Sequence, residues 1–545
     1  MGLPGPTLAA LCLLLLHALG HAQSSASPLR VFLFAGQSNM VGADTDLELA
    51  ESYPPYAGIT KPRADVRYAF SVGRSVSDGF VPLAPVDADF GPELTFAREV
   101  AKSTKGKFAI LKCAVGGTTI ARDWNPDAPD EGQKLYPRFV QLVRDSLARL
   151  DRAGVAWRLE ALFWHQGEND MLSREHNPEY EAGLTRFLAR LRADLDAPEL
   201  PVFLGEVSDR GIWGMDFRGP MRALRAQQRA VAATDPYVHF VPTSHLAFEV
   251  MGSGQPHYHF GTLGQLQHGE AYADAYLRTL GATPDEAAPQ KPYELPFRRG
   301  QKVRVFVLLG QRSMEGEGAF AQDLTAAQRK PRPDIPFRYH LGGGARISDD
   351  WAPLAPARLF DGFGPELSCG TALKNEPIAL VKFTDGAAQI SDWAVDHPDA
   401  SRPCRDAAVA FVRAALDDLE EQGFDPELAG IVWHHGENER YFTPFRNRYT
   451  EILRGVIADL RKALDAPEVP WLLAGISTRA PWGADAISQA NAELKALAES
   501  DPHIDFVDTS ELPHGRAMPG SEGTWELGLL LGGSCAKDRK ASSRR

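Results

Sequence analysis

The chain contains the same set of sequence blocks twice, and this repetition limits the folds that it can adopt. The repeated blocks keep their order and occupy residues 31–42 and 305–316, 163–170 and 432–439, 195–209 and 464–478, and 235–246 and 501–512. Ordered self-similarity indicates copies of one folding unit, and a chain of 545 residues is too long for one ordinary domain. We therefore predict tandem domains in residues 28–280 and 301–532, with a Pro- and charge-rich linker over 281–300. A basic tail, 533–545, is expected to be unstructured.

Short apolar runs alternate with helical patterns in the first copy. The runs that read as strands are 30–36, 107–115, 158–166, 200–207 and 238–244. Their continuous hydrophobicity indicates strands covered on both faces, as in a parallel sheet. Apolar residues at helical spacing from Phe139 to Leu150 predict an amphipathic helix that ends near Gly154. The predicted fold class is α/β, with a parallel sheet of about five strands and helices on both faces in each copy.

The amino terminus has the features of an export signal. An apolar run over residues 8–19 is followed by small residues that suit cleavage after Ala22. The run is too short to cross a bilayer. No Lys or Arg precedes it, so a buried helix is the alternative interpretation. We predict that residues 1–22 are a signal peptide and that the mature protein is secreted or periplasmic.

Charge and cysteine content exclude several classes of protein. A net charge of -13 argues against binding to nucleic acid or to an anionic membrane, because both require a basic surface. Four cysteines remain after the signal, too few for a disulfide scaffold, although Cys369 and Cys404 could pair in an oxidising compartment. The sequence has no HExxH zinc motif, no P-loop and no GxSxG elbow.

Polar and small residues follow the predicted strands. Ser38 follows the first strand, Gly116 and Gly117 follow the second, and residues 165–170 (HQGEND) follow the third. His259 lies in a His-rich stretch that leads into the last predicted helix of this copy. Each signal alone is weak, since a serine before asparagine is usually a helix cap. Together they matter, because ligands of such sheets bind beyond the carboxyl ends of the strands.

The order of these blocks resembles the SGNH (GDSL-like) hydrolases, in particular the sialate O-acetylesterase-like branch that includes carbohydrate esterase family six. The resemblance rests on FAGQSNM (34–40), FGPEL (90–94), KCAVGGTTIARDW (112–124) and FWHQGEND (163–170). It covers essentially the whole first copy and, more loosely, the second. It implies a flavodoxin-like sheet and cleavage of acetyl esters on carbohydrates, without a metal or an organic cofactor.

The resemblance also implies a role for each matching residue. Ser38 corresponds to the nucleophile and His259 to the general base. The oxyanion would be held by the N–H groups of Ser38 and Gly117 and by a side-chain amide, for which Asn169 is the first choice and Gln166 the second. Such groups suit ester hydrolysis, because a serine hydroxyl needs a base to take its proton and each oxyanion donor contributes roughly 3 kcal/mol.

The first copy departs from the family pattern at one position. The last block of the family reads Asp-x-x-His, and its Asp orients the imidazole. Here Pro256 stands at the Asp position. The first copy could run as a Ser–His dyad, could use another carboxylate such as Glu206 or Asp170, or could have lost activity. His257 is an alternative base, but His259 fits the block better.

The second copy departs much further. Ser38 aligns with Arg312, and Ser313 falls on the neighbouring Asn39 position, which would point its hydroxyl elsewhere. Gly117 aligns near Ala387, Gln166 with His435, and His259 with Ser521. We therefore predict a degenerate and inert second domain. It could hold glycan, could pack on the first domain and shape its cleft, or could only add stability, which is the interpretation we favour.

These observations predict an exported carbohydrate O-acetylesterase that works through a serine acyl-enzyme in its first domain. The expected partner is an acetylated carbohydrate, with no nucleic acid and no membrane after signal cleavage. The rival hypothesis is a non-catalytic glycan-binding protein made of two degenerate esterase folds. Peptidoglycan, xylan and sialic acid all remain candidate carriers of the acetyl group.

Overall fold

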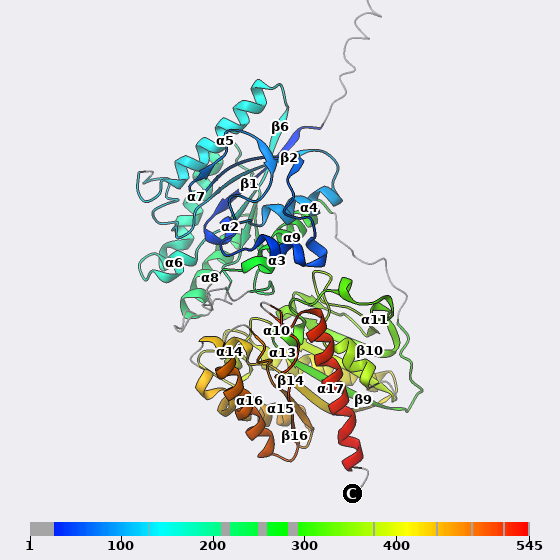
Figure 1. Cartoon of the computed structure of the whole chain (residues 1–545). Helices are drawn as coiled ribbons and strands as arrows, with labels where there is room; N and C mark the ends of the chain where they lie inside the picture. The colour runs from blue at the N-terminus through cyan, green and yellow to red at the C-terminus, as the bar shows by residue number, and fades with distance from the viewer. Residues whose placement is uncertain are drawn as a thin grey trace, which may run out of the picture.

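The computed structural model describes residues 27–128, 130–208, 218–248, 259–281, 293–373, 376–442, 445–480, 483–515 and 518–542. It contains two α/β domains (Figure 1), each built on an 8-stranded sheet. The strands of the first domain are β1 (Leu29–Gly36), β2 (Arg63–Val72), β3 (Ser75–Val76), β4 (Val81–Leu83), β5 (Phe108–Ala114), β6 (Trp157–His165), β7 (Val202–Gly205) and β8 (Val238–Val241). Its α-helices are α2 (Ser38–Val41), α3 (Leu47–Ser52), α4 (Glu93–Ser103), α5 (Leu135–Arg152), α6 (Glu168–Leu172), α7 (Tyr180–Asp194), α8 (Arg218–Thr234) and α9 (Gly261–Thr279). Single-turn 3-10 helices lie at η1 (Pro54–Tyr56) and η2 (Asn177–Glu179).

The sheet of the first domain is mainly parallel. Its order is β3-β2-β5-β1-β6-β7-β8, and all neighbours from β2 to β8 run parallel. The runs predicted as strands are confirmed, but the expected number of about five is too low. The sequence analysis missed β2 because it is amphipathic, with the polar residues Arg63, Asp65 and Arg67 in its first half. The short strands β3 and β4 pair antiparallel with β2.

Helices cover both faces of this sheet. Val31, Leu33 and Ala35 of β1 join a core cluster with residues of α5, α7 and α8. Phe32 and Phe34 join a second cluster with residues of α4 and α9. Alternate side chains of one strand thus enter two cores, which is the reason for its continuous hydrophobicity.

The second domain repeats this architecture. Its strands are β9 (Lys302–Gly310), β10 (Arg332–Leu341), β11 (Arg346–Ile347), β12 (Ala352–Leu354), β13 (Ile378–Thr384), β14 (Asp425–His434), β15 (Trp471–Ala474) and β16 (Ile504–Val507). Its α-helices are α10 (Arg312–Glu315), α11 (Ala326–Arg329), α12 (Glu366–Ala372), α13 (Cys404–Glu421), α14 (Glu437–Phe442), α15 (Tyr449–Ala463), α16 (Ala484–Glu499) and α17 (Gly520–Ser542). Its 3-10 helices are η3 (Ala321–Asp323), η4 (Gly342–Gly344), η5 (Ile390–Trp393) and η6 (Arg446–Arg448). The strand order β11-β10-β13-β9-β14-β15-β16 matches that of the first domain, as expected for a duplicated unit.

Three expectations about the second half need correction or refinement. Helix α17 continues to Ser542, so most of the tail expected to be unstructured is helical. Leu527, Leu531 and Cys535 lie one helical turn apart and are buried, which explains why the helix continues. Within the predicted linker, Phe297 packs edge-to-face on Phe424 of the second domain. No disulfide joins Cys369 on α12 to Cys404 on α13.

Candidate active site

Ser38 is the first residue of the short helix α2, directly after β1. Its side chain is 5% exposed. The turn before it requires glycine, because a Cβ on Gly36 would lie 2.0 Å from the carbonyl oxygen of His165 at the end of β6. Gly36 also has φ +153, outside the range that other residues prefer. The loops after β1 and β6 are therefore locked together at one end of the sheet.

His259 pairs with a carboxylate from the loop after α2. Its Nδ1 lies 2.5 Å from Asp44 Oδ2, and the two side chains are 18% and 30% exposed. Asp44 has φ 67, a left-handed conformation that aspartate tolerates better than most residues. A carboxylate at Nδ1 fixes the orientation and the tautomer of an imidazole.

Asn39 connects the segment of Ser38 to the segment of His259. Its Oδ1 accepts a hydrogen bond from the Phe260 N–H at 3.1 Å, and its carbonyl oxygen accepts one from Gln265 Nε2 at 2.7 Å. The residue after the predicted nucleophile is thus bonded to the residue after the predicted base. Among the described residues, the Ser38 hydroxyl accepts a hydrogen bond from Gln37 Nε2 at 3.5 Å and forms none directly with His259.

The Gln37 side chain connects Ser38 to the loop after β6. Its Nε2 donates to Asn169 Oδ1 at 3.0 Å, and its Oε1 accepts a hydrogen bond from the Gly167 N–H at 3.3 Å. Since the Asn169 oxygen is held in this way, its Nδ2 is the free end of the amide. This Nδ2 donates to no other residue in the described part of the chain, so it can serve as an oxyanion donor.

Gln166, the second candidate for that role, is fully engaged elsewhere. Its Nε2 donates to Gln37 Oε1 at 3.2 Å, to the Thr118 carbonyl at 3.0 Å and to Asp170 Oδ2 at 2.5 Å. The side chain is 0% exposed. A donor with three buried acceptors has no capacity for a substrate oxygen, so the geometry favours Asn169 over Gln166.

The loop after β5 brings Gly116 and Gly117 to Ser38. A Cβ on Gly116 would lie 3.5 Å from Ser38 Cβ, and both glycines are exposed. Asp170 holds this loop, because its carboxylate oxygens accept a hydrogen bond from the Ile120 N–H at 3.1 and 3.0 Å. Burial raises the pKa of Asp170 to about 6. Asp170 is therefore a support for the glycine loop.

The two carboxylates expected to assist His259 have other partners. Glu206 pairs with Arg225 at 2.5 Å and accepts a hydrogen bond from the Thr243 N–H at 3.0 Å, while Asp170 lies under the glycine loop. The expectation of Glu206 or Asp170 is thus corrected to Asp44, which sequence reasoning missed. The available signal was an acidic residue close after the nucleophile block, where the second copy has Gly318.

The other expectations about this region fall outside the described residues. Pro256 and His257 belong to residues 249–258, and the predicted signal peptide to residues 1–26.

A buried ion pair supports the helix that begins with Ser38. Lys112 Nζ lies 2.7 Å from Glu93 Oε2, and the two side chains are 1% and 0% exposed. Lys112 also donates to the Val41 carbonyl, the last residue of α2, at 3.2 Å. Burial lowers the pKa of Lys112, while Glu93 opposes this effect.

Replacing Lys112 with methionine is expected to lower the free energy of unfolding by about 3–5 kcal/mol, because the Glu93 carboxylate would stay buried without its cation. Urea denaturation followed by tryptophan fluorescence measures this change. The matched control is Lys102→Met, since the ion pair of Lys102 with Glu99 is exposed and should contribute less than about 1 kcal/mol. Equal stability of the two variants would contradict a supporting role for the buried pair.

The corresponding groups of the second domain are occupied within the protein. The Ser313 hydroxyl donates to Glu437. Ser521, expected at the position of His259, takes the place of Thr262 instead, because each hydroxyl accepts a backbone hydrogen bond in the first turn of the last helix. The Ser521 hydroxyl donates to Asp323 Oδ2 at 2.6 Å. Asn438, which aligns with Asn169, is buried and donates to the Gly386 and Ala388 carbonyls at 3.1 and 2.9 Å. The serine hydroxyls and the amide of this copy are thus already bonded to other groups.

The described residues contain no group of three or more His, Cys, Asp and Glu side chains that could hold a metal ion. Over the same residues, no helix combines the length and the hydrophobicity needed to cross a membrane.

A mainly parallel sheet with a serine, an aspartate-paired histidine and a half-buried amide at its strand ends has the arrangement of an α/β ester hydrolase. The family model described as carbohydrate esterase, sialic acid-specific acetylesterase, matches residues 28–278 and 302–535. The chain therefore belongs to this family of carbohydrate esterases, and it contains the family domain twice.

Individual relatives cover one domain each. A probable carbohydrate esterase from Arabidopsis thaliana is 28% identical over 210 residues, which are 35% of this chain and 73% of the relative. Among solved structures, one of an Arabidopsis thaliana protein is 22% identical with a TM-score of 0.36, over 46% of this chain and 99% of that chain. The structure of NanS is 15% identical with a TM-score of 0.36, over 47% and 99% of the two chains. A carbohydrate acetylesterase from Xanthomonas citri is 16% identical with a TM-score of 0.33, over 46% and 56%.

Proposed function

We propose that the first domain removes acetyl groups from acetylated carbohydrates by serine-dependent acyl transfer. The observation that carries this proposal is the 2.5 Å contact of His259 Nδ1 with Asp44, on the segment that follows Ser38. With Nδ1 engaged by a carboxylate, Nε2 is the ring atom that can take the serine proton. Membership of the carbohydrate esterase family supports the choice of substrate class.

In the proposed reaction, Ser38 Oγ attacks the acetyl carbonyl carbon while His259 Nε2 accepts the hydroxyl proton. The tetrahedral intermediate breaks its bond to the sugar oxygen, which leaves with the proton from the imidazolium. A water molecule then attacks the acetyl-enzyme and gives its proton to His259. Acetate leaves, and the proton returns to Ser38 Oγ.

The negative charge of the tetrahedral intermediates would be held by three hydrogen-bond donors. These donors are the N–H groups of Ser38 and Gly117 and the Asn169 amide. Their support is the network of Gln37 and Asp170, which fixes the loops before the substrate arrives. Donors held in advance stabilise the transition state without reorganisation.

The second domain is proposed to be catalytically inert. Arg312 replaces the nucleophile, and Met518 stands two residues before α17, where His259 stands two residues before α9. Asn438 donates to backbone carbonyls instead of a ligand. Export is likewise proposed, on the apolar run and cleavage site in residues 1–22. The location would then be secreted or periplasmic.

Acetate release from acetylated xylan, an O-acetylated sialoside and acetylated peptidoglycan tests the proposed function. The matched variants are Asn169→Ala in the first domain and Asn438→Ala at the same position of the second. We expect N169A to lower kcat by about 10²–10³-fold, because one oxyanion donor is lost. N438A, measured on its folded fraction, should stay within about twofold of the wild type.

Two outcomes would contradict the proposal. Release of no acetate from any substrate, with retained binding of the glycan, would favour a glycan-binding protein. If the two asparagine variants had equal kcat values, the first domain would not be the catalytic domain.

A further inference from the structure

The domains meet through the residue that replaces the nucleophile. Arg312 begins α10, which lies at the end of the second domain that faces the first (Figure 1). Its Nη2 donates to the carbonyl oxygen of Phe248 in the first domain and to Glu317 Oε1 at 2.8 Å. The same Glu317 oxygen accepts a hydrogen bond from the Phe248 N–H at 3.1 Å. An Arg–Glu pair of one domain thus binds both backbone groups of one residue of the other.

This contact, which we name the Arg312–Glu317 clasp, is buried. Arg312 and Glu317 are 3% and 2% exposed, and Phe248 is 3% exposed. Buried charges are costly unless hydrogen bonds compensate them. The backbone of Phe248 supplies an acceptor to the cation and a donor to the anion, so the clasp is matched to this segment of the first domain.

Residues 245–248 pack against the helix that follows the proposed base. The Ala247 N–H donates to Gln267 Oε1 of α9 at 2.7 Å. A Cβ on Gly264 of α9 would lie 2.3 Å from the Ala247 carbonyl oxygen, so helix and segment are in close contact. His259 lies two residues before α9 begins. Residues 245–248 therefore lie between the second domain and the helix that follows the base.

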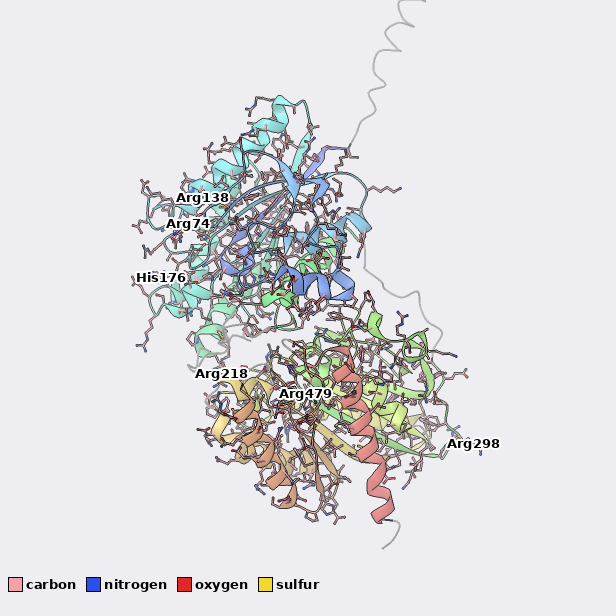
Figure 2. The ribbon with its side chains drawn as sticks, in the orientation of Figure 1. Arg74, Arg138, His176, Arg218, Arg298 and Arg479 are labelled. Atoms are coloured by element: carbon pink, nitrogen blue, oxygen red, sulfur yellow. The ribbon has the colours of Figure 1, made fainter. Side chains whose placement is uncertain are left out.

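Further contacts hold the two domains in this arrangement. His245 stacks on Phe360 with ring centroids 6.0 Å apart, and Tyr53 meets Phe320 at 5.4 Å. Arg218 of α8, at the boundary of the two domains in Figure 2, donates to Ser391 Oγ at 3.2 Å. The clasp is thus one of several contacts between the two domains.

We propose that the second domain positions the base of the first domain through this clasp, and that Arg312 and Glu317 are positioning residues. The proposal rests on the proposed function, because it assigns the clasp an effect on catalysis by His259. At the position of the proposed nucleophile Ser38, the second copy has Arg312, which would hold the active site of the first domain. The second copy is therefore more than an inert source of stability.

The test uses the full chain with Arg312→Met and, as a milder change, Glu317→Gln. The conservative variant is Arg312→Lys, since an ammonium group can still meet Glu317 and the Phe248 carbonyl. The matched control is Arg461→Met, because Arg461 bonds Asp501 at 2.6 Å and the Val469 carbonyl at 3.3 Å within the second domain. Each variant is assayed with p-nitrophenyl acetate and by hydrogen exchange of a peptide that contains residues 243–248.

We expect R312M to lower kcat by about 10²-fold with little change in KM, because a displaced base impairs the chemical step. E317Q should have a smaller effect of the same kind, and R312K should recover part of the loss. The peptide should exchange faster in R312M and at the wild-type rate in R461M. If R312M does not fold, the kcat of E317Q is compared with that of R461M, and this comparison tests the proposal instead.

A folded R312M or E317Q with kcat within about twofold of the wild type would overturn the positioning role. A wild-type protein without esterase activity would overturn it together with the proposed function. Hydrogen exchange separates the two failures, since faster exchange in R312M would still show that the clasp holds the segment.

Discussion

Replacing Ser38 with alanine is expected to lower kcat for p-nitrophenyl acetate by about 10⁴-fold or more. The alanine variant has no atom that can form the acyl bond, and only the oxyanion donors and substrate binding remain. The rate is measured as release of nitrophenolate at saturating substrate, with circular dichroism as the test of folding.

The control for this prediction is Ser313→Ala, the hydroxyl at the neighbouring position of the second copy. Ser313 donates to buried Glu437, so its loss should change kcat by less than about twofold while it lowers stability by roughly 1–3 kcal/mol. A Ser38→Ala protein that keeps the wild-type rate would show that hydrolysis occurs at another group.

Replacing Asp44 with asparagine is expected to lower kcat by about 10⁴-fold with little effect on folding. An amide at His259 Nδ1 favours the wrong tautomer of the ring and cannot stabilise the imidazolium that forms when Ser38 loses its proton. The contact itself is partly exposed, so its loss should change stability only slightly.

Glu206→Gln is the matched control, because Glu206 is one of the two carboxylates, with Asp170, that the sequence suggests as a partner of His259. It pairs with Arg225 and Arg229 instead of His259, so the folded fraction of E206Q should keep kcat within a few-fold of the wild type. If E206Q lost activity and D44N kept it, the assignment of Asp44 would be wrong.

Much of the fold could be predicted because its strands are buried on both faces. Strand β1 sends alternate residues into two cores, and its sequence is apolar apart from Arg30. Strand β2 was not predicted, because the residues of its first half are mostly polar and exposed to solvent, unlike those of a strand that is buried on both faces. The tail was misjudged because Cys535 is buried in the domain while the residues that follow, 537–540 (KDRK), are charged.

Only those residues of the candidate site that belong to recognisable sequence blocks could be predicted. Ser38, Gly117 and Asn169 stand in blocks with a recognisable order, and their loops meet at the same end of the sheet. The contact of Asp44 with His259 joins residues far apart in the sequence, and no periodicity or spacing encodes it. The clasp of Arg312 on Phe248 escaped prediction for the same reason, because each residue lies in a different domain.

The most direct test of this account is to locate the group that attacks the substrate. The intact protein is treated with a fluorophosphonate, which forms a stable adduct with an activated serine, and is then digested and analysed by mass spectrometry. We predict a single adduct on the peptide that contains Ser38, and its absence from the Asp44→Asn and Ser38→Ala proteins over the same reaction time. An adduct on Ser313 or Ser521, or none in the wild-type protein, would contradict the assignment of catalysis to the first domain.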